Sequence, residues 1–383
     1  MATPKLLLPL VALWLLGNMV FFYCYEVVIF LAFRAWSPSL YRSYMAAVQT
    51  AWVDVIATAF PTTDLIVSGQ LPTDPTKPAI ILCNHQIDAD WWYLWDLARR
   101  LGGGGNLKIC LKQELKYVPI FGWGLDLLEF LFVKRNVEHD RVHVNQHMAR
   151  FVREKFPFWM LVFPEGTTIH AEVMEKSQRF AQRTNRPELT RLLLPRTTGL
   201  HTMLAATEQI KPDVYDLTMA YPTYSGEVPT AAMGYSRKKD TGVPSMTDVL
   251  CGRGPTTVWI HGAKHTFDDV FENEEAFLDN AWQAKEKLLS DFISNQVHDP
   301  YPVAWHADGE LQEFAPAVKR RMLQSQRSWT NIVQLWASAA VALALSPVVA
   351  CFAGAYHAAS AAKHVAAWTS SCLVPSKPVD KTI

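Results

Sequence analysis

The chain has 383 residues, of which 50% are hydrophobic and 19% are charged, so it has enough apolar material for a sizeable core and is not a disordered chain. Lys plus Arg and Asp plus Glu each number 36, and the resulting net charge of zero argues against nucleic acid as a partner. The six cysteines lack CxxC spacing, which fits neither a disulfide framework nor a structural zinc site and is typical of a reducing compartment.

The first predicted element is an apolar run over residues 6–33, which only Asn18 and Glu26 interrupt. It holds about 28 residues where about 20 cross a bilayer, so we predict a membrane anchor over residues 1–35. A signal peptide fits less well, because the run outlasts a typical h-region and no A-x-A-like cleavage site follows it. A carboxylate in hydrocarbon needs a partner, so a two-helix anchor bent near Gly17 and Asn18 is as good an interpretation as a span.

A second apolar stretch without Asp, Glu, Lys or Arg covers residues 328–362 and predicts a C-terminal membrane helix over 329–362. Its one proline, Pro347, would kink such a helix without ending it in lipid. Positive flanks favour the cytosolic side of a membrane, so the region before this helix is expected to face the cytosol. The flanking cations are Lys319, Arg320, Arg321 and Arg327.

Between these stretches, short β-prone runs alternate with amphipathic segments, which predicts an α/β fold with a mixed, largely parallel sheet flanked by helices. We place this domain at 79–300, after an amphipathic lead-in at 36–78 and before a linker at 301–328 and a tail at 363–383. The expected strands are 79–83, 159–163, 192–195, 214–221 and 257–262, and the expected helices are 140–155 and 274–296.

The strand at 79–83 runs into Asn84 and His85, and Asp88 and Asp90 follow. A turn here would let Asp90 orient His85, which could then take a proton from a hydroxyl as a general base. A structural role for a loop His and Asp is the common alternative. Asp88 is read as an N-cap of the next helix, and the Asp88-Ala89-Asp90 pattern as a Mn²⁺ site is a remote alternative.

Two later strands also end in polar residues. Pro164-Glu165-Gly166-Thr167 makes a tight turn with exposed backbone amides, which suits strand termination or a polar substrate. Arg196 follows the strand at 192–195 and is well shaped for a phosphate. Further cations lie beside an apolar aromatic segment and suit a phospholipid headgroup better than plain solvation: Lys112, Lys116, Lys134 and Arg135.

Four motifs follow one another along the chain: Asn84-His85 with Asp90, Phe132-x-x-Arg135, Phe163-Pro164-Glu165-Gly166-Thr167, and Leu194-Pro195-Arg196-Thr197-Thr198-Gly199. In this order they resemble the motifs of the membrane-bound glycerolipid acyltransferases, in particular the eukaryotic branch with 1-acylglycerol-3-phosphate, lysocardiolipin and lysophosphatidylinositol acyltransferases. The resemblance covers roughly residues 79–200. Glu129 departs from the pattern, which often has Gly there, and this puts the local backbone geometry in question.

The resemblance implies that His85 deprotonates the sn-2 hydroxyl of a lysophospholipid, which attacks the thioester of acyl-CoA while Asp90 orients His85. The implied substrate-binding residues are Asn84, Lys112, Arg135, Glu165, Gly166, Thr167 and Arg196. The expected acceptor is 1-acyl-sn-glycerol-3-phosphate, with lysophosphatidylinositol or lysocardiolipin as the alternative. We expect acyl-CoA as co-substrate, no cofactor or metal, contact with membrane lipid, and residence in the endoplasmic reticulum membrane.

Two rival functions remain. A membrane esterase could use His85 and Asp90 to activate water, and a lipid-binding scaffold would need neither residue. The chain has no GxSxG nucleophile elbow, and Cys83 on its strand is read as a core residue. The His139, His143 and His147 series and the His261–His265 pair have metal-compatible spacing, but we interpret them as helix-surface or loop residues.

Overall fold

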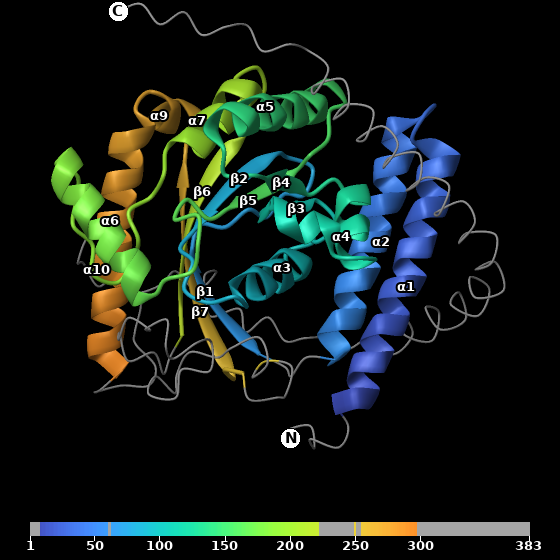
Figure 1. The fold of residues 1–383 in the computed structure, drawn as a ribbon, viewed down its shortest axis with the longest axis horizontal. Coiled ribbons are helices and arrows are strands. Elements are labelled where there is room, and N and C mark those ends of the chain that lie inside the picture. Colours follow the sequence, from blue (N-terminus) through green and yellow to red (C-terminus); the bar gives the residue numbers. More distant parts are fainter. Residues whose placement is uncertain (1–7, 60–62, 222–248, 250–253, 297–383) are drawn as a thin grey trace, which may run out of the picture.

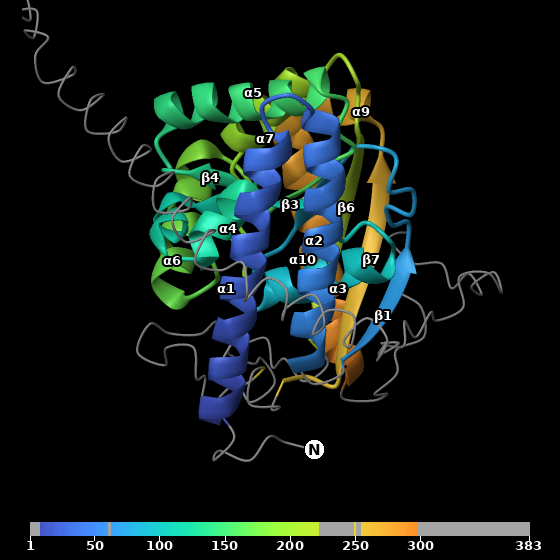
Figure 2. The ribbon, with the colours of Figure 1, turned by 90° about the vertical axis from the view of Figure 1, so that its right-hand side faces the viewer.

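The computed structural model describes residues 8–59, 63–221, 249 and 254–296 (Figure 1). The predicted C-terminal membrane helix, the linker with its basic cluster and the tail lie outside the described residues. Within the described part, one sheet is covered by helices on both faces, and two long helices run along one side of it (Figures 1 and 2).

The sheet has seven strands in the order β1-β7-β6-β2-β5-β3-β4. Every neighbouring pair is parallel except β6 and β7, which are antiparallel, so the predicted mixed, largely parallel α/β sheet is confirmed. The strands are β1 (Asp64–Gly69), β2 (Ala79–Cys83), β3 (Leu107–Lys112), β4 (Leu131–Val133), β5 (Trp159–Val162), β6 (Asp213–Ala220) and β7 (Thr257–His265).

The core lies on both faces of β2. Ile81 and Cys83 belong to one apolar cluster with residues of the helices α1 to α4, whereas Ile80 and Leu82 belong to a second cluster with residues of α5, α7 and α10. A strand covered on both faces reads as a continuous apolar run, which is why 79–83 was predictable. These helices are α1 (Leu8–Phe33), α2 (Pro38–Ala59), α3 (Asp90–Arg100), α4 (Phe121–Leu127), α5 (Val137–Arg153), α7 (Thr198–Thr207) and α10 (Glu274–Gln296).

The remaining helical elements are short or peripheral. They are the 3₁₀ turn η2 (Gln113–Tyr117), α6 (Ala171–Thr184) and α9 (Phe267–Phe271). Of the two helices predicted from the sequence, 274–296 matches α10, and 140–155 matches α5 with a start three residues too late. The Asn136 side chain accepts a hydrogen bond from the His139 amide at 3.1 Å and so caps α5 at an earlier residue than predicted.

The helices α1 and α2 form an antiparallel hairpin beside α3 and α4 (Figure 2). The segment Ala12–Phe33 of α1 is long and apolar enough to cross a membrane. The predicted bend at Gly17 and Asn18 is wrong, because α1 continues through both residues and the chain turns after Phe33. The Asn18 side chain donates to the Trp14 carbonyl at 2.7 Å, and this bond along the helix satisfies its amide without a break.

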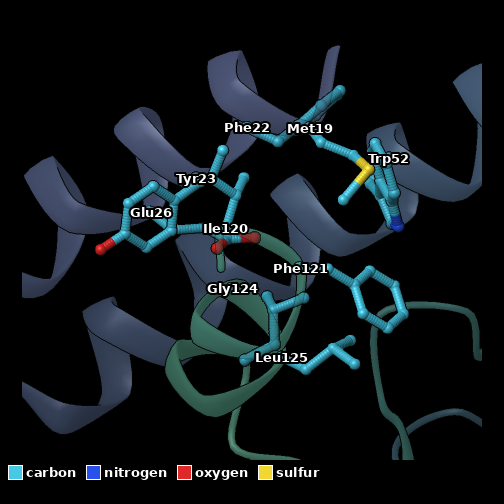
Figure 3. Close-up of a pocket in the computed structure, with 10 residues that line it drawn as sticks. Met19, Phe22, Tyr23, Glu26, Trp52, Ile120, Phe121, Gly124 and Leu125 are labelled. Atoms are coloured by element: carbon cyan, nitrogen blue, oxygen red, sulfur yellow. The ribbon is translucent and has the colours of Figure 1, made fainter. Parts of the chain in front are cut away.

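The buried carboxyl group of Glu26 lies on the inner face of this hairpin, where it is 3% exposed. Figure 3 shows it beside a small pocket between α1 and α4, with Ile120 and Phe121 nearby. A β-carbon placed on Gly124 would lie 2.9 Å from Glu26 Oε2, so the glycine makes room for the carboxyl group. The acidic residue inside the apolar run therefore faces the domain, and the outward face of α1 carries Leu13, Leu16, Val20, Val28 and Leu31.

Two strand predictions need correction. Residues 192–195 are not a strand: the Leu193 amide donates to Glu165 Oε2 and the Leu194 amide donates to Ser177 Oγ, so side chains replace a neighbouring strand. The sheet also begins earlier than predicted, because β1 lies inside the segment assigned to the lead-in. As a half-buried edge strand with polar residues, β1 lacks the apolar run that marks a central strand.

Candidate active site

The turn between β2 and α3 places a histidine against a carboxylate. His85 Nδ1 lies 2.9 Å from Asp90 Oδ2, although the two residues are five apart in sequence. The predicted turn brings them together, and Asp90 is the first residue of α3. A carboxylate only accepts hydrogen bonds, so Nδ1 carries the proton and Nε2 is the basic nitrogen. The ring also stacks on Phe163, with 4.2 Å between ring centroids, which fixes its plane.

Asp90 has no solvent exposure, and both of its carboxylate oxygens accept hydrogen bonds from the protein. Oδ2 also accepts the backbone N–H groups of Gln86 at 2.6 Å and Ile87 at 2.9 Å. Oδ1 accepts the hydroxyl of Tyr221, which directly follows β6, at 2.5 Å. A buried carboxylate needs such donors to offset the loss of hydration, and with them Asp90 can hold an imidazolium.

Asn84 and Glu165 support the turn from behind. The Asn84 side chain donates to the Met219 carbonyl at 3.0 Å and accepts from the Met219 amide at 2.8 Å, which ties the end of β2 to β6. Glu165 accepts from the His85 amide at 3.1 Å and from the Trp282 indole at 3.3 Å. Burial raises the pKa of Glu165 to about 8, against the effect of its hydrogen bonds, which lower it. Neither side chain lines the cavity described next.

A cavity of about 500 Å³ opens in front of His85. Strand ends and the helices α5 and α7 form its walls, as expected where the carboxyl ends of parallel strands meet. Its apolar lining includes Ile109, Leu111, Val133, Val144, Val162, Leu200 and Met203. Its cations are Lys112, Arg135, Arg141 and Arg196, all with exposed side chains. Such a cavity suits a ligand with an apolar chain and an anionic group.

The two motif arginines meet at Gly166. Arg135 donates to the Gly166 carbonyl, and a β-carbon on Gly166 would lie 3.6 Å from Arg196 Nε. Gly166 has a φ of +74°, a conformation that favours glycine, and Thr167 beside it also lines the cavity. Asp140 accepts the amides of Lys134 and Asn136, each at 2.9 Å, and thereby holds the backbone on both sides of Arg135, whose φ is +61°.

Comparison with known proteins finds a family match over the part of the chain that holds most of this site. The profile of the Acyltransferase family matches residues 64–222, from the start of β1 to the residue after Tyr221. The chain contains an Acyltransferase-family domain. A relative named probable 1-acyl-sn-glycerol-3-phosphate acyltransferase 5, from Arabidopsis thaliana, is 33% identical over 61% of this chain and 58% of its own length. Lysocardiolipin acyltransferase 1 of Danio rerio is 28% identical over 67% of this chain and 63% of its own length.

Both of these matches span less than two thirds of the relative's length. Among solved structures, the 1-acyl-sn-glycerophosphate acyltransferase PlsC from Thermotoga maritima is similar, with a TM-score of 0.45 and 16% sequence identity. That similarity covers 75% of this chain and 95% of PlsC.

Glu129 in the acyltransferase domain has the backbone conformation of a glycine, with a φ of +61°. Its buried carboxylate binds Arg42 of α2, with Oε2 at 2.7 Å from Nε, and Arg150 of α5, with Oε1 at 3.3 Å from Nη2. Burial alone would raise the pKa of Glu129, but the Arg42 bond and the nearby cations outweigh it and lower the pKa. The side chain thus makes an ion-pair link between the hairpin and the domain, which a glycine cannot make.

His147 and His261, two of the histidines with metal-compatible spacing, have hydrogen-bond partners within the protein. His147 Nε2 lies 3.1 Å from the Glu129 carbonyl, and His261 Nδ1 lies 2.9 Å from Ser68 Oγ. The prediction as helix-surface or loop residues is wrong for three of the five histidines: His261 and His265 belong to β7, and His147 is buried on α5. Within the described ranges, no group of three or more His, Cys, Asp or Glu could hold a metal ion.

Sequence reasoning missed three residues around the site. Tyr221 and Trp282 bind the carboxylates of Asp90 and Glu165, and Arg141 lines the cavity from α5. Tyr221 ends the run 214–221, so its position could have been found by pairing that strand with β2. Nothing in the sequence around Trp282 indicates a contact with a turn more than a hundred residues earlier.

Proposed function

We propose that the chain is an acyl-CoA-dependent acyltransferase that esterifies the sn-2 hydroxyl of 1-acyl-sn-glycerol-3-phosphate and forms phosphatidic acid. The single observation that carries the proposal is the His85–Asp90 pair at 2.9 Å, whose histidine lines the same cavity as Arg135 and Arg196. His85 faces the same cavity as Arg135 and Arg196, whose guanidinium groups suit a phosphate. An acceptor that carries a hydroxyl near its phosphate requires this combination. The names of the two relatives, both acyltransferases, support the same reaction class.

In the proposed reaction, His85 Nε2 removes the proton of the acceptor hydroxyl as its oxygen attacks the thioester carbonyl. The bond between the carbonyl carbon and sulfur then breaks, and the proton passes from His85 to the departing CoA sulfur. Asp90 stabilises the imidazolium between these two steps. Acyl group and proton are both accounted for, and no acyl-enzyme is formed.

A cysteine nucleophile fits the cavity less well. Cys110 lines it, but burial raises the pKa of the thiol to about 12, so the reactive thiolate is scarce at neutral pH. Cys83 is fully buried on β2 and lies outside the cavity lining. The groups that line the site are therefore sufficient for direct transfer from acyl-CoA to the acceptor.

We further propose that the protein works at the endoplasmic reticulum membrane, with the acyltransferase domain facing the cytosol and membrane lipid as a partner. The apolar outward face of α1 supports membrane contact, because such a surface is costly to leave in water. Trp36 and Tyr44, both exposed near the hairpin turn, are residue types that favour the interface. Retention of the full chain in the pellet after carbonate extraction is expected, and its release would contradict the proposal.

The test uses the purified full chain with labelled acyl-CoA and a panel of lysophospholipids. We expect label in phosphatidic acid when lysophosphatidic acid is the acceptor, and loss of that product in His85→Ala. Release of labelled fatty acid without an acylated acceptor would identify an esterase instead. Much faster acylation of monolysocardiolipin or lysophosphatidylinositol would correct the headgroup while the acyltransferase chemistry stands.

A further inference from the structure

We propose that Tyr221 is a positioning residue, whose hydroxyl fixes Asp90 and sets how strongly Asp90 holds His85. The inference rests on the proposed function, because it assigns Tyr221 a role in general-base catalysis. Tyr221 is outside the cavity lining, so it acts through Asp90 and not on a substrate.

The position of Tyr221 follows from the sheet. It is the residue after β6, which pairs in parallel with β2, and Cys83 at the end of β2 lies opposite Leu217. The residues that follow β2 and β6 therefore lie at the same edge of the sheet, at the carboxyl ends of the two strands. Asp90 also lies there. The Tyr221 ring has no solvent exposure and packs edge-on against Tyr93, with 5.9 Å between centroids. This packing holds the Tyr221 hydroxyl group in position 2.5 Å from Asp90 Oδ1.

The two oxygens of Asp90 have different tasks. Oδ2 accepts from His85 and from two backbone amides, whereas Oδ1 accepts from Tyr221. The Tyr221 bond therefore gives Oδ1 a donor as well, and it opposes rotation of the carboxylate group about the Cβ–Cγ bond of Asp90. It also draws negative charge toward Oδ1 and away from the oxygen that faces His85.

The hydroxyl stays a donor in this setting. Burial raises the pKa of Tyr221 well above its ordinary value, and the neighbouring Asp90 raises it further. Other titratable groups around this corner are Tyr93 of α3 and Cys83 of β2, and burial raises the pKa of each. Beyond them are Glu165 behind His85 and the ion pair between Asp216 of β6 and Lys285 of α10, with 2.7 Å between Oδ1 and Nζ.

Tyr221→Phe removes the donor and keeps the ring. More negative charge then faces His85, the protonated imidazole becomes more stable, and a higher pH is needed to form the neutral base. We expect kcat to fall by about 10–100-fold, the loss that corresponds to a hydrogen bond with a charged group, and the acidic limb of the kcat/KM profile to move to higher pH. Both KM values should change little.

Tyr93→Phe is the matched control. Tyr93 is also buried beside Asp90, but its hydroxyl has no hydrogen-bond partner within the described part of the chain. The same deletion of one oxygen there should leave both kcat and the acidic limb unchanged. A loss of rate in Tyr93→Phe equal to that in Tyr221→Phe would overturn the inference, because general packing would then explain both.

A second variant tests the direction of the effect even where Tyr221→Phe folds poorly. Replacing Tyr221 with 3-fluorotyrosine gives a stronger donor of nearly the same size, and the acidic limb should then move to lower pH. A limb that stays in place in both folded variants, whatever happens to kcat, would assign Tyr221 a merely structural role and overturn the proposal. Failure of the proposed function is distinct, because the wild-type chain would then make no acylated acceptor at all.

Discussion

The two sides of the cavity are built in different ways. On one side Asp90 is fully buried and receives four hydrogen bonds, so the histidine next to it has one orientation. On the other side the four cations have exposed side chains, and within the described part of the chain the side chains of Lys112, Arg141 and Arg196 make no hydrogen bond or ion pair. In the proposed reaction, the buried corner around His85 and Asp90 is preorganised for one proton transfer, whereas the exposed rim formed by the four cations can adjust to different anionic groups.

The largest expected effect breaks the buried corner. His85→Ala and Asp90→Asn should each lower acyl transfer by about 10²–10⁴-fold, the range that general-base catalysis supplies. Product formation is measured with labelled acyl-CoA at saturating acceptor, and thermal unfolding checks that each variant folds. Near-normal turnover by a folded His85→Ala protein would sink the mechanism.

A smaller effect is expected at the rim. Arg135→Ala and Arg196→Ala should each raise the KM of the acceptor by about tenfold or more, since a charged hydrogen bond contributes roughly 1.5–3 kcal/mol. The KM of acyl-CoA should change much less. Arg135→Lys keeps the charge but loses the forked geometry, so an intermediate KM is expected.

Two results would contradict the prediction for Arg135 and Arg196. Equal increases in both KM values would mean that the arginines do not separate acceptor from donor. An effect on kcat alone would place Arg135 or Arg196 with the buried corner and not with the adjustable rim.

The difference between corner and rim also decided what could be predicted. His85 and Asp90 lie in one short turn after an apolar strand, so local sequence was enough to place them together. Tyr221 and Trp282 reach the same corner from distant elements, and only the pairing of strands and the packing of α10 bring them there. Glu165 and Asn84 were assigned to the substrate, but their hydrogen-bond partners lie behind the cavity. These partners are backbone groups, with the Cys83 thiol added for Asn84 and the Trp282 indole added for Glu165.

Burial on both faces made three of the strands predictable. The central strands β2, β5 and β6 are covered on both faces and stand out as apolar runs, whereas β1 and β4 lie at the two edges and do not. Residues 192–195 show the converse error. They are apolar because Leu193 packs with Ile169 and Met174, not because they pair with a strand. Asp88 was expected to cap α3, but the helix begins at Asp90 after Ala89, and Asp88 lines the cavity.

Glu165 offers a test of the buried side through stability. Its pKa of about 8 lies above the ordinary value of 4.5, so the folded state favours the protonated form. Its contribution to the free energy of unfolding is complete below pH 4.5 and decreases as the pH rises toward 8, by at most about 1.4 kcal/mol per pH unit. Glu165→Gln imitates the protonated carboxyl group and lacks this loss.

The measurement is the melting temperature of wild type and Glu165→Gln between pH 5 and pH 8. The variant should gain stability relative to wild type as the pH rises. Parallel pH dependences of the two melting temperatures would instead show that the three N–H donors hold Glu165 as a carboxylate throughout this range, and Glu165 would then join Asp90 as a charged member of the buried corner.

The smallest expected effect concerns Asp88, on the boundary between corner and rim. Asp88 and Asp90 form a D-x-D pattern, but Asp90 is buried and has no free oxygen for a cation, because Oδ1 binds Tyr221 and Oδ2 binds His85. We therefore expect Asp88→Asn to retain activity within about twofold, because Asp88 is only partly buried at the cavity wall and solvent screens its charge. Exhaustive EDTA treatment should leave turnover unchanged. Restoration of lost activity by Mn²⁺ would return Asp88 and Asp90 to a metal role, and the tightly bonded corner would then have to open to bind the ion.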